Sequence, residues 1–356
     1  MAQSGLIFNA GMNGTLTLDG RTWPLRLESL ESMHNAVQEP WQEAIVDFLE
    51  RWWGNEETVQ VHTSGSTGDP RPLAHSKADM VDSAHRTIQH FGLTPGTKAG
   101  LAMPVQFIGG MMMLVRAEAG GWNLTAVQPQ ATPNFGDALD FVALTPSQAQ
   151  AWQRAHPAEW SSCKQLLVGG GQSPAAWLKD APAAPEIHEG FGMTETISHF
   201  AVRQLHPTCE PSFRCLPGFT VSTDNRNALR IELPDGQTLQ TNDAAEVQHA
   251  QSFRWLGRLD DVVNSGGIKI HPALVERELA SIIPGPFACY GAPDVKWGQA
   301  LVLRIHAHQE PEDVDRERAR IATWAEGNLP RRHVPKRIEW LPLEATESGK
   351  WKRPRI

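Results

Sequence analysis

Short apolar runs alternate with longer amphipathic patterns over the first half of the chain. The longer patterns place apolar residues on one face of a helix, whereas the runs between them fit buried strands. The strand-like runs cover 59–61, 99–103, 124–127, 141–144 and 166–168, and the helical patterns cover 40–52, 77–91 and 111–119. Leu16–Leu18 and a turn at Asp19-Gly20 predict an opening hairpin before them. This alternation is typical of an α/β domain with a largely parallel sheet.

The pattern changes near residue 200 to shorter strand-like runs separated by turn residues. Leu229–Leu233 followed by Asp235-Gly236 is typical of these runs, and we expect a β-rich subdomain over 200–256. From Asp261 onward, helical patterns at 274–283 and 313–329 predict a small α+β domain. A chain of 356 residues also exceeds what one compact core usually holds. We therefore predict a large N-terminal domain over 1–259 and a small C-terminal domain over 260–356.

Composition excludes several classes of partner. The chain is 40% hydrophobic and 20% charged, as in an ordinary globular protein, and its net charge of −8 argues against nucleic acid or an anionic membrane as a partner. No stretch approaches about 18 consecutive apolar residues, and no signal peptide begins the chain, so we expect no membrane insertion. The spacing of Cys163, Cys209, Cys215 and Cys289 indicates neither a zinc site nor a disulfide framework, which favours the cytoplasm. The sequence leaves a monomer and a homo-oligomer equally open.

A segment rich in hydroxyl side chains and glycine follows the run at 58–61. It consists of Thr63, Ser64, Gly65, Ser66, Thr67 and Gly68, followed by Asp69, Pro70 and Arg71. Glycine lets backbone N–H groups approach an anion closely, and hydroxyl groups can donate to the same oxygens. The segment is not a Walker A loop, because Gly-Lys-Ser/Thr is missing at the required spacing. It predicts a phosphate site, although an ordinary surface loop has a similar composition.

Three further motifs follow the segment at 63–71 in a fixed order. They are Phe191–Thr196, then Gly257–Asp261 with its continuation through Pro272 to Glu276, and finally Thr346–Arg353. Together the four resemble the adenylate-forming superfamily, which contains acyl- and aryl-CoA synthetases, luciferases and the adenylation domains of peptide synthetases. Arg71 stands where that family has lysine, which keeps the charge and changes the donor geometry. Only 62 residues precede Thr63, so the N-terminal domain is expected to be abbreviated and to suit a compact acid.

The resemblance implies a nucleotide site for ATP. The segment Thr63–Arg71 would hold the phosphates, and the backbone after the run at 166–168, with an aromatic residue, would hold adenine. The residues implied for adenine are Gly169, Gly170, Gly171, Phe191 and Gly192. Asp243 would accept the ribose hydroxyls and Arg258 would assist, although an isolated arginine is more often a surface residue. Asn242 replaces a glycine of the family, which a left-handed backbone would tolerate because asparagine enters that region readily.

The resemblance also implies the catalytic groups. Lys350 would bring charge to the carboxylate and the α-phosphate, and Glu195 beside Thr194 would hold Mg²⁺. Thr194 and Glu195 could instead cap a helix, and Lys350 could belong to a basic tail with Lys352 and Arg353. Asp260 corresponds to the hinge about which the C-terminal domain of the family rotates. Gly266, Gly267 and Lys269 would then contact CoA.

The segment 103–119 corresponds to the region that holds the acid in this family. Its form resembles the o-succinylbenzoate–CoA ligases of menaquinone biosynthesis, although Phe107 stands where these enzymes commonly have histidine. The residues implied for the acyl pocket are Phe107, Gly109, Gly110, Arg116, Ser198 and His199. Arg116, Ser198 or His199 would donate to the second carboxylate of the substrate, or Arg116 would have a structural role alone. Another aryl- or short acyl-CoA synthetase, an adenylation domain that loads a carrier protein, and a non-catalytic nucleotide-binding homologue are the alternatives.

Overall fold

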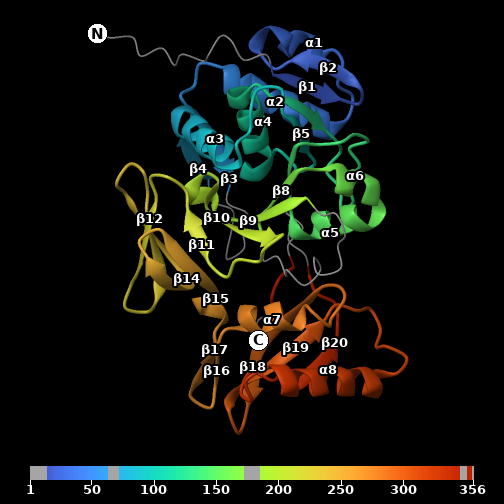
Figure 1. Cartoon of the computed structure of the whole chain (residues 1–356), viewed down its shortest axis with the longest axis vertical. Helices are drawn as coiled ribbons and strands as arrows, with labels where there is room; N and C mark the ends of the chain where they lie inside the picture. Colours follow the sequence, from blue (N-terminus) through green and yellow to red (C-terminus); the bar gives the residue numbers. More distant parts are fainter. Residues whose placement is uncertain (1–13, 63–71, 172–184, 345–350, 355–356) are drawn as a thin grey trace. The chain divides into compact units, whose positions relative to one another are not determined.

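The chain divides into two compact units at Glu210–Pro211 (Figure 1). The computed structural model describes residues 14–62, 72–171, 185–344 and 351–354. Unit 1 contains the described residues up to Glu210, and unit 2 contains those from Pro211 onward. The predicted domain boundary between residues 259 and 260 lies inside unit 2 and stays a prediction.

Unit 1 is built on a mixed sheet whose central strands are parallel. The strands of unit 1 follow the order β10-β9-β8-β7-β5-β6-β1-β2. Their bounds are β1 Thr15–Leu18, β2 Arg21–Pro24, β5 Lys98–Leu101, β6 Asn123–Ala126, β7 Phe141–Leu144, β8 Gln165–Val168, β9 Glu186–Gly192 and β10 His199–His206. The pairings from β1 to β9 are parallel, and only the outer strands β2 and β10 pair antiparallel. The predicted parallel α/β sheet is therefore confirmed.

Six α-helices and a 3-10 turn connect the described strands of unit 1. They are α1 Leu30–His34, α2 Pro40–Trp53, α3 Lys77–Phe91, α4 Ile108–Gly120, α5 Pro146–Ala155 and α6 Pro157–Ser162, with a 3-10 turn η1 at Leu27–Ser29. The Ser76 hydroxyl caps α3 by accepting from the Asp79 N–H, and Gly92 ends the helix in a left-handed conformation. α4 packs against α3 and against β5 and β6. Every residue of α4 from Gly110 to Ala117 is buried, so this helix forms the centre of unit 1.

The strand-like run at 59–61 does not join the parallel sheet in which it was expected. It forms β3, Thr58–His62, which pairs antiparallel with β4, Pro72–Ser76, in a separate two-stranded sheet. Alternation of apolar runs with helices therefore predicted the wrong sheet for this strand. The reason is that β4 begins only ten residues after β3 ends, which is too short for the helical crossover that parallel pairing requires.

Unit 2 contains a β-rich part and an α+β part. The β-rich part has the strand order β12-β13-β14-β15-β11, with antiparallel pairs along it. Its strands are β11 Phe213–Cys215, β12 Thr220–Thr223, β13 Ala228–Glu232, β14 Thr238–His249 and β15 Ser252–Arg258, followed by the 3-10 turn η4 at Leu259–Asp261. The prediction of a β-rich segment before residue 256 agrees with these strands.

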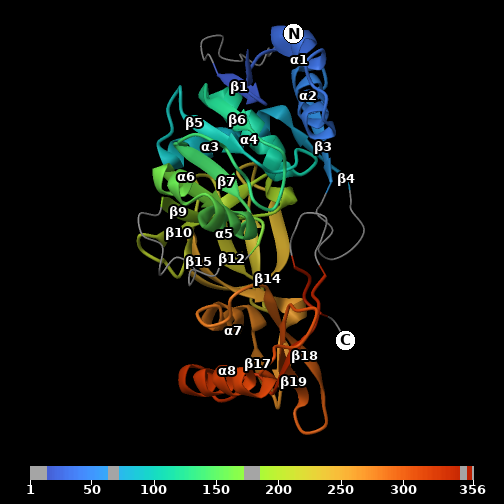
Figure 2. The same ribbon diagram turned by 90° about the vertical axis from the view of Figure 1, so that its right-hand side faces the viewer.

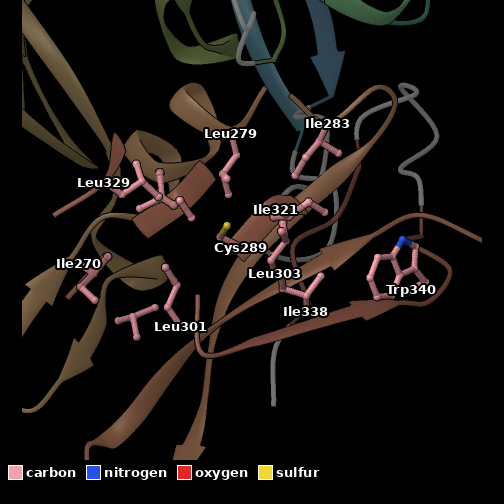
Figure 3. Packing of buried hydrophobic residues seen from close by; sticks show 13 residues of the cluster. Ile270, Leu279, Ile283, Cys289, Leu301, Leu303, Ile321, Leu329, Ile338 and Trp340 are labelled. Carbon is pink, nitrogen blue, oxygen red and sulfur yellow. The ribbon is translucent and has the colours of Figure 1, made fainter. Parts of the chain in front are cut away.

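The α+β part of unit 2 has its own sheet and core. Its elements are β16 Val263–Ser265, β17 Ile268–Ile270, α7 Pro272–Leu279, β18 Phe287–Asp294, β19 Gly298–Ile305, α8 Val314–Asn328 and β20 Arg337–Trp340. α8 lies alongside β18 and β19 (Figure 2) and contributes Ile321 to the core. Figure 3 shows the Cys289 thiol in the middle of this core, between Leu279 and Leu303. Burial raises the pKa of this thiol well above its usual value, so it behaves as a small apolar side chain.

Among the described helices, none has both the length and the apolar composition that crossing a bilayer would require.

Candidate functional site

The residues predicted for ligand binding in unit 1 gather beyond the carboxyl ends of its parallel strands. β5 leads into Met103 and the start of α4, β8 leads into Gly169–Gly171, and β9 ends at Gly192. Because these strands are parallel, the segments that follow them lie at the same edge of the sheet. Ligands bind at this edge in open α/β sheets, so the fold brings together residues far apart in sequence.

The motif after β9 forms a short 3-10 turn, η3 at Thr194–Thr196. The Thr196 hydroxyl accepts from the Met193 N–H at 3.0 Å and also lies 2.7 Å from the Ser198 carbonyl. His75 of β4 lies 2.7 Å from the Thr194 carbonyl through Nε2. Thr196, not Thr194, therefore makes the cap-like bonds, and no longer helix follows. The alternative in which Thr194 and Glu195 cap a helix is not what the structure shows.

Ile197 adopts a conformation that β-branched residues avoid. Its φ is 65° and its ψ is −52°, and the Ser198 N–H donates to the Thr196 carbonyl at 2.7 Å across it. This is a γ-turn of the rare, strained type. Strain of this kind costs about 1–3 kcal/mol and clusters at functional sites. Here the turn positions Ser198 immediately before β10.

Arg116 is the centre of a buried polar cluster in unit 1. The guanidinium lies on α4 and is only 2% exposed. Its Nε donates to the Thr87 hydroxyl of α3 at 3.2 Å, and its Nη2 donates to the Ser198 hydroxyl. Ser198 Oγ lies 3.2 Å from His199 Nδ1, and His199 Nε2 lies 3.5 Å from Thr87 Oγ1. Three predicted acyl-pocket residues, Arg116, Ser198 and His199, are thus in contact.

The Arg116 charge has no carboxylate partner within the described residues. Its bonded neighbours there are two hydroxyl groups and the sulfur of Met113, at 3.7 Å. Burial lowers the pKa of Arg116 to about 10. Burial, together with the nearby Arg116 charge, lowers the pKa of His199 well below its usual value, so the imidazole is neutral. A buried, uncompensated cation is costly to a folded protein, and a ligand anion would compensate it.

Two glycines of the predicted site are required by close packing. A Cβ at Gly110 would lie 2.4 Å from the Pro104 carbonyl oxygen, and one at Gly192 would lie 2.3 Å from the Ser198 carbonyl oxygen. Gly109 has more room, because its nearest neighbour would be the Met103 sulfur at 3.5 Å. Phe107 is the residue before the first turn of α4 and makes no side-chain cap. Gly110 and Gly192 therefore let two backbone segments pack closely beside the Arg116 cluster.

The predicted ribose residues of unit 2 also lie together. Asp243 of β14 is opposite Arg258 of β15 in the strand register, and the nearest N–O distance between their side chains is 3.6 Å. The Trp255 indole donates to the other Asp243 oxygen at 2.9 Å. Burial raises the pKa of Asp243, while the Trp255 hydrogen bond and the Arg258 charge act in the opposite direction. One hydrogen-bond donor and one nearby cation thus orient a buried carboxylate.

Asn242 connects this site with the predicted hinge residue. It lies within β14, and the non-glycine residues with positive φ in the described chain are Asp19, Ile197 and Asn227. The backbone at Asn242 is therefore not left-handed, so that reason for tolerating asparagine in place of glycine does not apply. The Asn242 amide instead donates to both carboxylate oxygens of Asp260 at 2.7 Å, and Arg258 Nη2 lies 3.7 Å from Asp260. A side chain that the family lacks at this position thus contacts the predicted hinge.

Sequence reasoning missed a partly buried arginine, whose side chain is 19% exposed. Arg353 donates to the Asp261 carboxylate and, at 2.6 Å, to the Glu276 carboxylate of α7. Burial lowers the pKa of Arg353, but the charges of Glu276 and Asp261 outweigh that effect and raise it. Glu276 also accepts from the Cys289 N–H at 2.6 Å. All three charged residues were within the recognised motifs, but their spacing gave no sign that they meet.

Four of the tryptophans share a role that composition did not reveal. Several indole N–H groups donate to carboxylates inside the protein. These pairs are Trp52 and Trp53 with Glu118, Trp152 with Glu159, and Trp255 with Asp243. An indole provides a large apolar surface with one donor, so it can pack in a core and still satisfy a buried oxygen.

The remaining predicted residues lie at exposed positions or outside the described chain. Gly266 and Gly267 form the left-handed turn between β16 and β17, and Lys269 follows them on the surface. Glu195 is exposed and has no hydrogen bond or ion pair within the described residues, so its carboxylate is free to accept a cation. The segment Thr63–Arg71 and Lys350 lie outside the described residues. Among the residues the structure describes, no three His, Cys, Asp or Glu side chains form a metal-binding group.

Comparison with known proteins agrees with this arrangement. The sequence model of the AMP-binding enzyme family matches residues 25–242, which is more than half of the chain. The chain belongs to this family. It is 33% identical to an acyl-CoA synthetase (AMP-forming)/AMP-acid ligase II-like protein from Dyadobacter fermentans, with 88% of this chain and 93% of that one covered and a TM-score of 0.58.

More distant similarities extend the comparison. The chain is 25% identical over 329 residues to the 2-succinylbenzoate–CoA ligase of Staphylococcus aureus, which covers 83% of this chain and 65% of the relative. The chain therefore spans about two thirds of the length of the curated relatives it matches. The o-succinylbenzoate CoA synthetase of Bacillus subtilis, solved with its acyl-adenylate intermediate, has a TM-score of 0.70 at 19% identity and covers 86% of this chain and 72% of its own. At that identity the likeness shows a shared fold.

Proposed function

We propose that this protein is an AMP-forming acid–CoA ligase whose substrate is an aromatic dicarboxylic acid, o-succinylbenzoate. Membership of the AMP-binding enzyme family supports the reaction class. The 2-succinylbenzoate–CoA ligases at 25% identity support the choice of acid and a role in menaquinone biosynthesis. The observation that carries the substrate proposal is the buried guanidinium of Arg116, which lacks a carboxylate within the described residues.

The reaction proceeds in two steps that share the acyl group. A carboxylate oxygen of the acid attacks the α-phosphorus of ATP, the bond between the α-phosphorus and the bridging oxygen breaks, and pyrophosphate leaves. The CoA sulfur then attacks the acyl carbonyl, loses its proton, and displaces AMP. Because the first step joins two anions, charge neutralisation and positioning contribute most of the rate enhancement.

Each predicted residue has a defined part in this scheme. Asp243 would accept the ribose hydroxyls of ATP, with its orientation set by Trp255 and Arg258. The segment 63–71 and Lys350 would meet the phosphates and the attacking carboxylate. Glu195 would hold Mg²⁺, which would neutralise triphosphate charge when bound and would need only one or two protein oxygens beside phosphate and water. The hinge role of Asp260 and the CoA contacts of Gly266, Gly267 and Lys269 remain part of the proposal.

Arg116 would bind the carboxylate that does not react. Five N–H groups belong to a guanidinium, and within the described residues two donate to hydroxyls and one approaches sulfur. The others are available to a carboxylate, which binds guanidinium strongly through charge-assisted hydrogen bonds. Phe107 and the apolar residues of α4 suit the aromatic ring.

A panel of acids tests this function. Purified protein with ATP and Mg²⁺ is assayed for release of AMP and pyrophosphate on o-succinylbenzoate, benzoate and a short fatty acid, with and without CoA. We expect o-succinylbenzoate to have the highest kcat/KM and AMP release to require CoA. Equal use of all acids would contradict the substrate. Pyrophosphate exchange that does not depend on CoA, without a CoA thioester product, would indicate a carrier-loading domain, and no turnover on any acid would contradict catalysis.

A further inference from the structure

Four residues of the Arg116 cluster form a closed ring of polar contacts, in which Thr87 and His199 are the members that complete the ring. The ring runs from Arg116 through Ser198 and His199 to Thr87 and back to Arg116. Its members come from α3, α4 and the start of β10. Thr87 lies 29 residues before Arg116, and Ser198 lies 82 residues after it.

The direction of every bond in this ring follows from donor and acceptor chemistry. Arginine only donates, so Thr87 Oγ1 and Ser198 Oγ both accept from Arg116. The single Thr87 hydroxyl proton is donated to the Ser83 carbonyl at 3.2 Å, so it cannot also be given to His199. His199 Nε2 must therefore carry a proton and donate to Thr87. A neutral imidazole then has a lone pair on Nδ1, which accepts from the Ser198 hydroxyl.

We propose that Thr87 and His199 are positioning residues that fix the Arg116 guanidinium for the second carboxylate of the substrate, with His199 as the neutral Nε2–H tautomer. The proposal rests on the function given above and names residues that act through Arg116 without touching the reacting atoms. Two fixed N–H groups hold the guanidinium plane, so its free N–H groups point in a constant direction. An arginine held in this way loses less conformational entropy when the carboxylate binds.

The strained turn at Ile197 supports the same interpretation. The γ-turn at φ 65° places Ser198 between Arg116 and His199, and relaxation of the turn would remove a member of the ring. Gly192 contributes as well, because any Cβ there would collide with the Ser198 carbonyl. Two locally costly features thus converge on one hydroxyl group.

Substitutions at Thr87 test the proposal through acid selectivity. The readout is the ratio of kcat/KM for o-succinylbenzoate to kcat/KM for each monoacid that retains one of its two carboxylates, 3-benzoylpropionate and 2-butyrylbenzoate. One of these monoacids retains the carboxylate that reacts, and the ratio measured against it is the informative one. We expect Thr87→Val to lower that ratio by about tenfold, mainly by raising the KM of the diacid. Thr87→Ser is expected to restore the ratio. Thr97→Val is the matched control, because the buried Thr97 hydroxyl bonds, within the described part of the chain, only to the Thr94 carbonyl and N–H.

A ratio for Thr87→Val equal to that of the unmodified protein would overturn the proposal, whereas failure of the unmodified protein to use the diacid would overturn the proposed function instead. The tautomer gives a second test that needs neither substrate nor a Thr87 variant. Long-range ¹H–¹⁵N spectra of histidine-labelled protein, with His199 identified by its loss in His199→Gln, are expected to show a proton on Nε2 and none on Nδ1. A proton on Nδ1 would contradict the ring, even if Thr87→Val did not fold.

Discussion

Two arginines, one partly buried and one fully buried, have opposite surroundings in the two units of this protein. Arg353 in unit 2 donates to two carboxylates, Asp261 and Glu276, and their charges raise its pKa. Arg116 in unit 1 donates to two hydroxyls, and burial lowers its pKa to about 10. The first cation is neutralised by the fold itself. The second has no carboxylate partner within the described residues, and its charge would be neutralised by the ligand that we propose.

Unit 1 also contains a paired arginine of the same kind. Arg203 of β10 faces Glu189 of β9 across the strand pair, with an N–O distance of 2.6 Å from Nε, and both side chains are buried. Burial alone therefore does not leave an arginine without a carboxylate in this unit. The lack of a carboxylate beside Arg116, among the described residues, therefore depends on which side chains surround this arginine.

The largest expected effect concerns the stability of the paired arginine. Arg353→Met would remove the cation that bonds to the partly buried carboxylates of Asp261 and Glu276, which we expect to lower the free energy of unfolding by about 3–5 kcal/mol. Urea denaturation followed by circular dichroism measures it. Arg116→Met is the matched comparison and should change stability by less than about 1 kcal/mol, since it removes an uncompensated charge. Equal losses of unfolding free energy in Arg353→Met and Arg116→Met would contradict the difference that we infer between the two arginines.

The next effect is on the pH dependence of stability. The pKa of His199 is lowered in the folded protein, so below about pH 6.5 the unfolded chain binds a proton that the native chain does not. Stability therefore falls as pH decreases below that value, by at most about 1.4 kcal/mol per pH unit for this group. His199→Gln should have a shallower acid limb in urea titrations between pH 6.5 and 5. Identical slopes would mean that His199 titrates normally.

The smallest expected effect on stability concerns an arginine of intermediate exposure. Arg258 is 34% exposed and lies 3.6 Å from Asp243 and 3.7 Å from Asp260. Arg258→Met should cost less than about 1 kcal/mol in unfolding, because both carboxylates keep another donor, Trp255 or Asn242. ATP affinity, measured by calorimetry, should fall by about tenfold to a hundredfold.

Arg254→Met is the control for this variant. Arg254 lies on the same strand and makes a comparable ion pair, at 3.4 Å, with Glu246. It should retain the affinity of the unmodified protein for ATP. Unchanged ATP affinity in Arg258→Met would remove Arg258 from the nucleotide site, and equal losses in both variants would indicate a general effect of charge.

Local signals in the sequence predicted most of the elements. The helix at 77–91 agrees with α3 residue for residue, because Ser76 and Gly92 mark its two ends. The helix expected at 111–119 begins three residues earlier, since Gly109 and Gly110 belong to α4 despite their low helix propensity. The helix expected at 274–283 covers Pro272–Leu279 instead, because proline is favoured in the first turn. Periodicity thus located the elements, and residues at their ends decided the bounds.

The candidate site could be predicted only in part. The motifs named Arg116, Ser198 and His199 as a group, and the structure brings them together. Thr87 carried no signal, because a threonine in a helix has no distinguishing neighbours in sequence. The pairing of Arg353 with Asp261 spans 92 residues, and such contacts depend on the packing of whole elements. Charge balance around a buried group is a property of the tertiary structure, and no local pattern encodes it.

The most direct test of the unpaired arginine is the acid selectivity of Arg116→Met. The ratio of kcat/KM for o-succinylbenzoate to kcat/KM for the monoacid that retains the reacting carboxylate is measured in the unmodified protein, in Arg116→Met and in the charge-retaining Arg116→Lys. A charge-assisted hydrogen bond of about 3 kcal/mol predicts a ratio about a hundredfold lower in Arg116→Met, with Arg116→Lys between the two. A ratio in Arg116→Met that matches the unmodified protein would contradict the account, because the buried cation would then have no part in binding the second carboxylate.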